Sequence, residues 1–162
     1  MNIQRKSKGF TIIEVVLVLA IAGLIFLMVF IALPALQRSQ RDMQRKTDLS
    51  RAITAVTSYA SNNRNALPDT TNNAAWSTFS NSYLRAGSVN GVGGDTFMDP
   101  SGSDYVFKTT GAPAASFDSA NPYIFVTGGS TCNGEALITG QGARKVALRM
   151  KLEGGGIACV SN

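Results

Sequence analysis

The feature that most constrains this chain is a run of 22 residues, 15–36, that contains no charged side chain. As a helix rising 1.5 Å per residue, the run covers about 33 Å, close to the roughly 30 Å hydrocarbon core of a bilayer. The apolar core of a cleaved secretory signal is only about 7–15 residues long and ends at a small-x-small site. This run is longer, and Leu33 stands where a small residue is needed before Ala35. We therefore expect the segment to span a membrane.

Helical periodicity continues beyond residue 36, although the composition changes. Pro34 can kink a helix without ending it, and the first strong stop is Leu67-Pro68-Asp69. A mostly apolar stripe recurs at spacings of three and four residues and comprises Leu49, Ala52, Ile53, Val56, Ala60 and Asn63. The charged residues Arg45, Asp48 and Arg51 lie between its members. The pattern predicts one helix of about 55 residues, with a membrane-spanning half (10–36) and an amphipathic half (37–64).

Residues 65–162 have the composition of a small α+β head, rich in Gly, Ser and Asn. Aromatic residues at 76, 79 and 83 predict a short helix, and residues 90–94 predict a loop. We expect strands at 105–108, 123–127, 144–152 and 157–160; the third is the clearest, because Val146, Leu148 and Met150 alternate with polar or small residues. The predicted fold is α+β, with the apolar face of a small antiparallel sheet packed on the long N-terminal helix.

The net charge of +5 is distributed unevenly along the chain. Residues 1–9 carry +3 and residues 37–64 carry +4, whereas residues 65–162 carry −1. A general nucleic-acid-binding domain would carry clustered positive charge in its folded part. One predicted strand carries a row of bases, Lys145, Arg149 and Lys151, that could contact DNA or an acidic protein. The net charge of the head does not indicate such a partner.

The sequence contains two cysteines and no histidine, and it offers no nucleophile–base pair or metal cluster, so we expect no enzyme activity. In an exported chain, Cys132 and Cys159 are expected to form a disulfide, with a buried free pair as the alternative. We expect no cofactor. Calcium is the one ion left open, at Asp95, Asp99 and Asp104, although Asp99 also begins a good turn.

A short basic leader, with Arg5, Lys6 and Lys8, precedes the motif Lys8-Gly9-Phe10-Thr11-Ile12-Ile13-Glu14. Leader, glycine, aromatic residue, glutamate and apolar run together resemble the processing site of type IV prepilins and pseudopilins. The resemblance implies that residues 1–9 are a leader, removed by a membrane aspartyl protease (prepilin peptidase) that cuts after Gly9 and N-methylates Phe10. A glycine at the cleavage site leaves the backbone open to a protease, and a basic leader stays on the cytoplasmic side.

Glu14 is the only charged residue between residues 10 and 36. An ionised side chain in a membrane-spanning helix costs a few kcal/mol, so its presence points to a function. It lies four residues, or about 6 Å along the axis, from the amine that cleavage would create on Phe10. In a bundle of parallel helices it could neutralise that amine in a neighbouring copy, and the resemblance implies this assembly role.

The resemblance implies a structural subunit of a type IV pilus, a homo-oligomeric helical filament assembled through the N-terminal helix. Before assembly the chain would lie in the cytoplasmic membrane, single-pass with its C-terminal head (65–162) outside, and would contact the bilayer, the prepilin peptidase and an inner-membrane assembly platform. Afterwards it would be extracellular. A type II secretion pseudopilin, a competence (DNA-uptake) pilus subunit and a membrane-anchored adhesin or binding module that does not polymerise are the alternatives, and motility, adhesion, secretion and DNA uptake are not distinguished.

Overall fold

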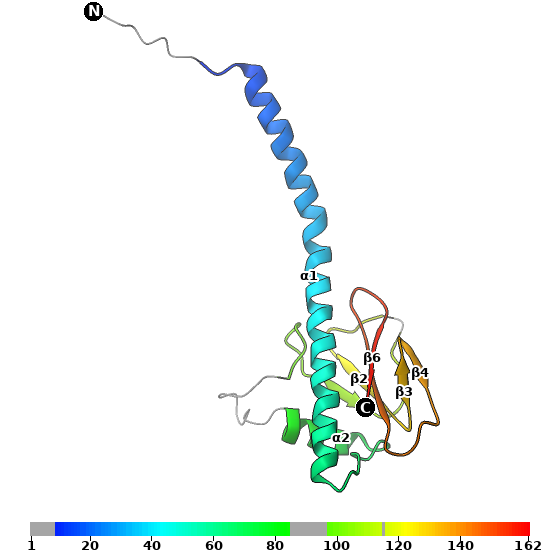
Figure 1. Ribbon diagram of the computed structural model, residues 1–162. Coiled ribbons are helices and arrows are strands. Elements are labelled where there is room, and N and C mark those ends of the chain that lie inside the picture. Colours follow the sequence, from blue (N-terminus) through cyan, green and yellow to red (C-terminus); the bar gives the residue numbers. More distant parts are fainter. Residues whose placement is uncertain (1–8, 85–96, 115) are drawn as a thin grey trace, which may run out of the picture. The chain divides into compact units, whose positions relative to one another are not determined.

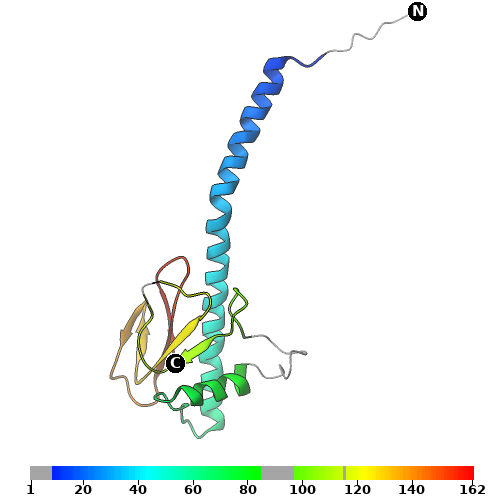
Figure 2. The same cartoon turned by 180° about the vertical axis from the view of Figure 1, so that it is seen from behind.

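The computed structural model describes residues 9–84, 97–114 and 116–162, and the chain separates into two compact units, Met1–Gln37 and Arg38–Asn162. Figures 1 and 2 show one long helix and a small head of helices and strands, which confirms the α+β class. The elements are α1 (Ile12–Asn62), α2 (Asn73–Phe79), the π-helical turn η1 (Ser80–Leu84), β1 (Val106–Lys108), β2 (Tyr123–Gly128), β3 (Thr131–Asn133), β4 (Ala136–Ile138), β5 (Val146–Lys151) and β6 (Ile157–Ser161). The basic leader and the loop predicted at 90–94 lie outside the described residues.

Helix α1 has 51 residues and contains Pro34, as expected for a proline that does not end the helix. It stops at Asn62, before the predicted Leu67-Pro68 stop, and the amide of Asn65 donates to the carbonyl of Ala60 at 2.7 Å. Four members of the predicted apolar stripe are buried, which confirms the prediction for Leu49, Ala52, Val56 and Ala60.

The main sheet has the strand order β1-β2-β5-β6, and β5 pairs antiparallel with both of its neighbours. The edge strand β1 is parallel to β2, whereas we expected a wholly antiparallel sheet. The connection between them, residues 109–122, is long enough to return the chain to the same end of the sheet, which a tight hairpin cannot do. A second sheet, the hairpin β3–β4, was not predicted, because its three-residue strands are too short to show alternation.

The inner face of the sheet and the stripe of α1 contribute to one core. The predicted alternation along β5 is confirmed, since Val146, Leu148 and Met150 are all buried. Trp76 on α2 is fully buried, and its ring centroid lies 5.5 Å from that of Phe107 on β1. This helix therefore closes the core beside the edge strand.

Cys132 on β3 and Cys159 on β6 form a disulfide, which confirms the expected pair and excludes the free thiols. Their Cα atoms lie 5.7 Å apart, and 27 positions separate them in the sequence. By the chain-entropy estimate, closing such a loop stabilises the fold by about 3–4 kcal/mol. The bond fastens the small hairpin to the last strand of the main sheet.

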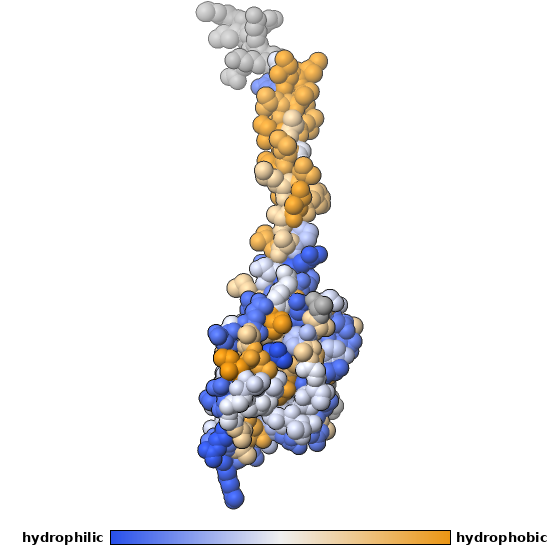
Figure 3. Space-filling model, turned by 90° about the vertical axis from the view of Figure 1, so that its right-hand side faces the viewer, coloured by the Kyte–Doolittle hydropathy of each residue, from blue (hydrophilic) through white to orange (hydrophobic). Residues whose placement is uncertain are grey.

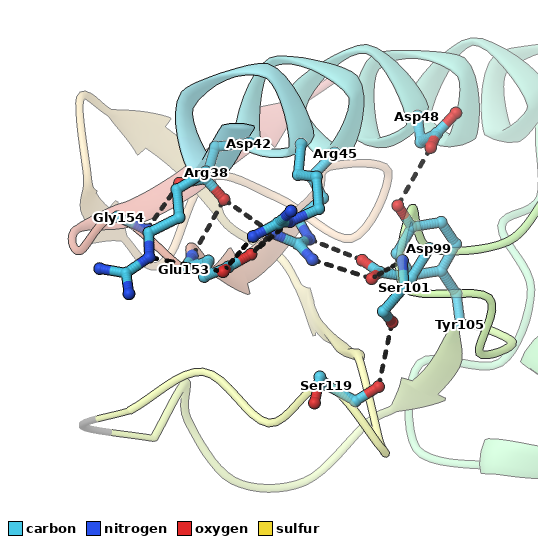
Figure 4. A network of polar contacts seen from close by, with 11 residues as sticks. Arg38, Asp42, Arg45, Asp48, Asp99, Ser101, Tyr105, Ser119, Glu153 and Gly154 are labelled. Atoms are coloured by element: carbon cyan, nitrogen blue, oxygen red, sulfur yellow. Dashed lines mark hydrogen bonds and ion pairs between the residues drawn. The ribbon is translucent and has the colours of Figure 1, made fainter. Parts of the chain in front are cut away.

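A buried arginine joins α1 to the loops of the head (Figure 4). Arg45 is fully buried and donates two hydrogen bonds to the carboxylate of Asp99, from Nε at 2.6 Å and from Nη2 at 2.9 Å. Its Nη1 donates to Asp42 at 2.9 Å and to Glu153 at 3.2 Å. The guanidinium carbon lies 4.0 Å from the ring centroid of Phe117.

The carboxylates around Arg45 have further donors. Asp42 accepts the backbone amides of Glu153 at 2.9 Å and Gly154 at 2.7 Å, which fixes the turn between β5 and β6 on α1. Asp99 accepts the amide of Ser101 at 2.9 Å. Periodicity had placed Arg45 and Asp48 on the polar side of the helix, and this was wrong. Both are buried because residues far along the chain supply their partners, including the Tyr105 hydroxyl, 3.0 Å from Asp48.

These contacts move the pKa values in the directions that the geometry dictates. Burial lowers the pKa of Arg45, but its hydrogen bonds with Asp99 and Asp42 outweigh burial and raise the pKa above the ordinary value. Burial raises the pKa of Asp99, and the hydrogen bonds from Arg45 and Ser101 bring it below the ordinary value. A hydrogen bond from Arg41, acting against burial, lowers the pKa of Glu153 to about 2. Arg45, Asp99 and Glu153 are therefore ionised at neutral pH.

We predict that Arg45→Met lowers the free energy of unfolding by about 3–5 kcal/mol, because it leaves the buried carboxylate of Asp99 without its counter-charge. Denaturant unfolding of the full chain in a neutral detergent, followed by the fluorescence of the single tryptophan, measures the change. The matched control is Arg38→Met: this side chain is 61% exposed and its Nε lies 3.8 Å from Glu153, so about 1 kcal/mol or less is expected. Equal effects of the two substitutions would contradict the role given to Arg45.

We also predict an acid-sensitive contribution from Glu153. Its pKa is lowered from 4.5 to about 2 in the folded state, so its stabilising effect is complete above pH 4.5 and is lost as the pH falls through about 2. The difference in free energy of unfolding between the wild type and Glu153→Gln should therefore shrink over that range. A difference that stays constant from neutral pH to pH 2 would show that the ionised Glu153 is not what stabilises the turn.

Candidate functional site

The candidate site is the motif at the start of α1. Gly9 and Phe10 precede the helix, which begins at Ile12, and both are exposed. A Cβ added to Gly9 would meet no atom within 4 Å, and Phe10 is 87% exposed. The bond between these residues is therefore non-helical, uncovered and open to a protease on its glycine side.

Thr11 and Glu14 cap the helix reciprocally. The amide of Glu14 donates to the Thr11 hydroxyl oxygen at 3.3 Å, and Oε2 of Glu14 accepts the amide of Thr11 at 3.4 Å and its hydroxyl at 3.3 Å. This is the capping-box arrangement, which satisfies amides that the first turn of a helix leaves unpaired. The carboxylate also lies at the positive end of the helix dipole.

The cap explains why an acid is tolerated beside a long apolar segment. Oε2 of Glu14 is occupied by Thr11, whereas Oε1 accepts no hydrogen bond from the residues that the structure describes. One carboxylate can thus hold its own helix end and still accept a cation. The role of Thr11 was missed in the sequence, although its signal, a Thr followed three residues later by a Glu, is present there.

The apolar surface behind this cap is uncovered. The large apolar side chains between residues 10 and 36 are exposed, and Figure 3 shows them as a band of hydrophobic surface along the helix. Of the described helices, α1 is the one that is long and apolar enough to cross a membrane, by length and composition. The most exposed of these side chains are Phe10, Ile12, Ile13, Met28, Phe30 and Ile31.

The other sequence candidates take different places. Asp99 binds Arg45, Asp95 lies outside the described residues, and within the described part of the chain no three His, Cys, Asp or Glu side chains are grouped to hold a metal ion. Lys145 donates to the C-terminal Asn162 at 2.9 Å, and Arg149 is half-buried on β5. The row of bases predicted on that strand is therefore not a uniform solvated face.

The comparisons with known proteins agree with the motif. Residues 4–30 match the family model described as the prokaryotic N-terminal methylation motif. No curated protein and no solved structure matches the chain. The chain thus carries the class III prepilin leader of type IV pilins and pseudopilins, and this motif supports a type IV pilin-like or pseudopilin-like subunit.

Proposed function

We propose that this chain is a structural subunit of a type IV pilus, which acts by polymerisation rather than by catalysis. Cleavage after Gly9 and N-methylation of Phe10 precede its assembly through α1 into an extracellular filament. The observation that carries the proposal is a methylation motif, with a capped carboxylate at Glu14, at the head of an exposed apolar helix. Its partners are copies of itself, the prepilin peptidase, an inner-membrane assembly platform and, before assembly, the bilayer.

The apolar half of α1 has two physical requirements. Its side chains need a cover other than water, which lipid supplies before assembly and neighbouring copies supply afterwards. When copies pack together, the new amine on Phe10 enters a medium of low dielectric and needs a counter-charge. The free Oε1 of Glu14 can provide it, in the same copy or in the next one, which favours a fixed axial register between helices.

We predict that Glu14→Ala, as the sole subunit, leaves insertion in the membrane equal or increased but abolishes or cripples filament formation. Insertion improves because no charge has to be desolvated, whereas assembly fails because the amine of Phe10 has no partner. Membrane fractionation combined with electron microscopy of sheared filaments separates the two effects.

Two matched variants separate charge from capping. Glu14→Gln keeps an oxygen for the cap but has no charge, so it should assemble as poorly as Glu14→Ala. Thr11→Val removes the capping hydroxyl at a cost of about 0.5–2 kcal/mol in helix stability and keeps the charge, so it should still form filaments. Normal filaments from Glu14→Ala or Glu14→Gln would refute charge pairing as the basis of assembly.

A further inference from the structure

A groove of about 450 Å³ lies between two connections of the head, the one from α1 to α2 and the one from β4 to β5. Both connections lie at the end of the head where α1 terminates, as Figures 1 and 2 show. Arg64 and Asp69 belong to the first wall, and Ala143 and Arg144 to the second. The groove thus has an arginine on each side.

Among the described residues, the guanidinium groups of these two arginines take no part in the fold. Arg64 and Arg144 are exposed, and within the described residues neither guanidinium has a hydrogen-bond or ion-pair partner, in contrast to the fully paired Arg45. Of the described lining residues, Asp69 is the one acid, and its Oδ1 is occupied by the amide and the hydroxyl of Thr71, at 2.9 and 2.7 Å. The donors of the two arginines therefore remain available to a ligand.

The first wall holds its arginine in an unusual backbone conformation. Arg64 has φ of 53° and Asn65 has φ of 65°, in the left-handed region. Asn tolerates this region, but for Arg it is unfavourable, and a Gly would adopt it without cost. Strained residues of this kind gather at functional sites. The strained turn is held in place at its far end, where Pro68 is buried and the indole of Trp76 donates to the Asp69 carbonyl at 3.1 Å.

The second wall is also fixed. The side-chain amide of the C-terminal Asn162 donates to the carbonyl of Arg144 at 2.9 Å, and the amide of Gly129 donates to the carbonyl of Lys145 at 2.7 Å. The end of β2 packs closely on the first wall, since a Cβ added to Gly128 would lie 2.5 Å from the Thr70 hydroxyl oxygen. Two available guanidinium groups are thus carried on backbone that is already ordered, which favours binding.

From this arrangement we propose that the groove binds a phosphate group between Arg64 and Arg144. A guanidinium donates two parallel hydrogen bonds to an oxyanion. The oxygens of a phosphate point in several directions from one centre, so forks from two opposite walls can reach it together, whereas a carboxylate presents both of its oxygens in one plane. The site does not depend on assembly and adds a binding activity to the proposed filament subunit.

The lining also limits the source of the phosphate. Among the described residues, no aromatic side chain lines the groove, so these residues offer no surface on which a nucleobase could stack. The ligand is therefore either free phosphate or the backbone of a phosphodiester chain, contacted without regard to sequence. A phosphodiester chain would bind weakly to the one site on a single subunit, and a filament that repeats the site would bind it with greater avidity.

The test is a titration of the full-length protein in neutral detergent, with ¹⁵N-labelled arginine, observed through the side-chain Nε–H resonances. Inorganic phosphate and a short thymidine oligonucleotide are the two probes. We expect the Nε–H resonances of Arg64 and Arg144 to shift as the probe is added and to reach saturation. Tighter binding of the oligonucleotide would identify a phosphodiester chain, with a salt slope of about −0.7 for one neutralised phosphate, and tighter binding of inorganic phosphate would identify the free ion.

The variants are Arg64→Gly, Arg144→Gln and, as a control for loss of one positive charge, Lys46→Gln on the exposed side of α1. Each arginine variant should weaken phosphate binding about tenfold or more, since a charge-assisted pair is lost, and the control should not. Arg64→Gly also relieves the positive φ, so its unfolding midpoint should not fall. Should this variant unfold, Arg144→Gln on the opposite wall decides the question. The proposal is overturned by absent saturation, by unchanged binding in Arg144→Gln, or by equally tight binding of poly-glutamate through the same resonances.

Discussion

The apolar half of α1 imposes the constraint on which the rest of this structure depends. Its side chains are exposed, and water cannot cover a helix that is apolar all round without a large free-energy penalty. Under the function proposed above, lipid covers it before assembly and other copies of the same helix cover it afterwards, and lipid gives no hydrophobic drive for helices to associate. The proposed assembly would then depend on specific packing and charge pairing. This explains why the single charged residue of the segment, Glu14, lies at its very beginning, where a cap with Thr11 and the helix dipole both tolerate it.

In the head, a small sheet is held on one side of a helix by two kinds of contact. Apolar packing along the stripe from Leu49 to Ala60 supplies the driving force for the sheet to pack on the helix. The ion cluster around Arg45 fixes how the segments of the head are positioned on that helix. Because its carboxylates come from α1, from the loop before β1 and from the turn after β5, this one guanidinium fixes three segments at once. The net stabilisation from a buried cluster of this kind is smaller than its attraction alone, because the desolvation of its charges offsets much of that attraction.

Local patterns in the sequence predict the elements that depend on local periodicity. The long helix, its buried stripe and the alternation along β5 follow from spacings of 3.6 and 2 residues. The closing strand β6 follows from the glycine-rich turn before it, and the export context predicts the cysteine pair. Long-range pairing is not visible in such patterns. The burial of Arg45 depends on Asp99 and Glu153, more than fifty residues away, and the parallel pairing of β1 depends on a long connection. The left-handed conformation of Arg64 likewise has no signature in its own residue type.

The central claim, a filament subunit made by cleavage before Phe10, is tested most directly by the mass of the subunit in the filament. Filaments sheared from cells that produce this chain are purified, and the intact subunit and its N-terminal peptide are analysed by mass spectrometry. The account predicts a chain that begins at Phe10 and carries a methyl group on its amine. A filament-associated chain that begins at Met1 or after Ala35, or filaments that lack this chain altogether, would contradict it.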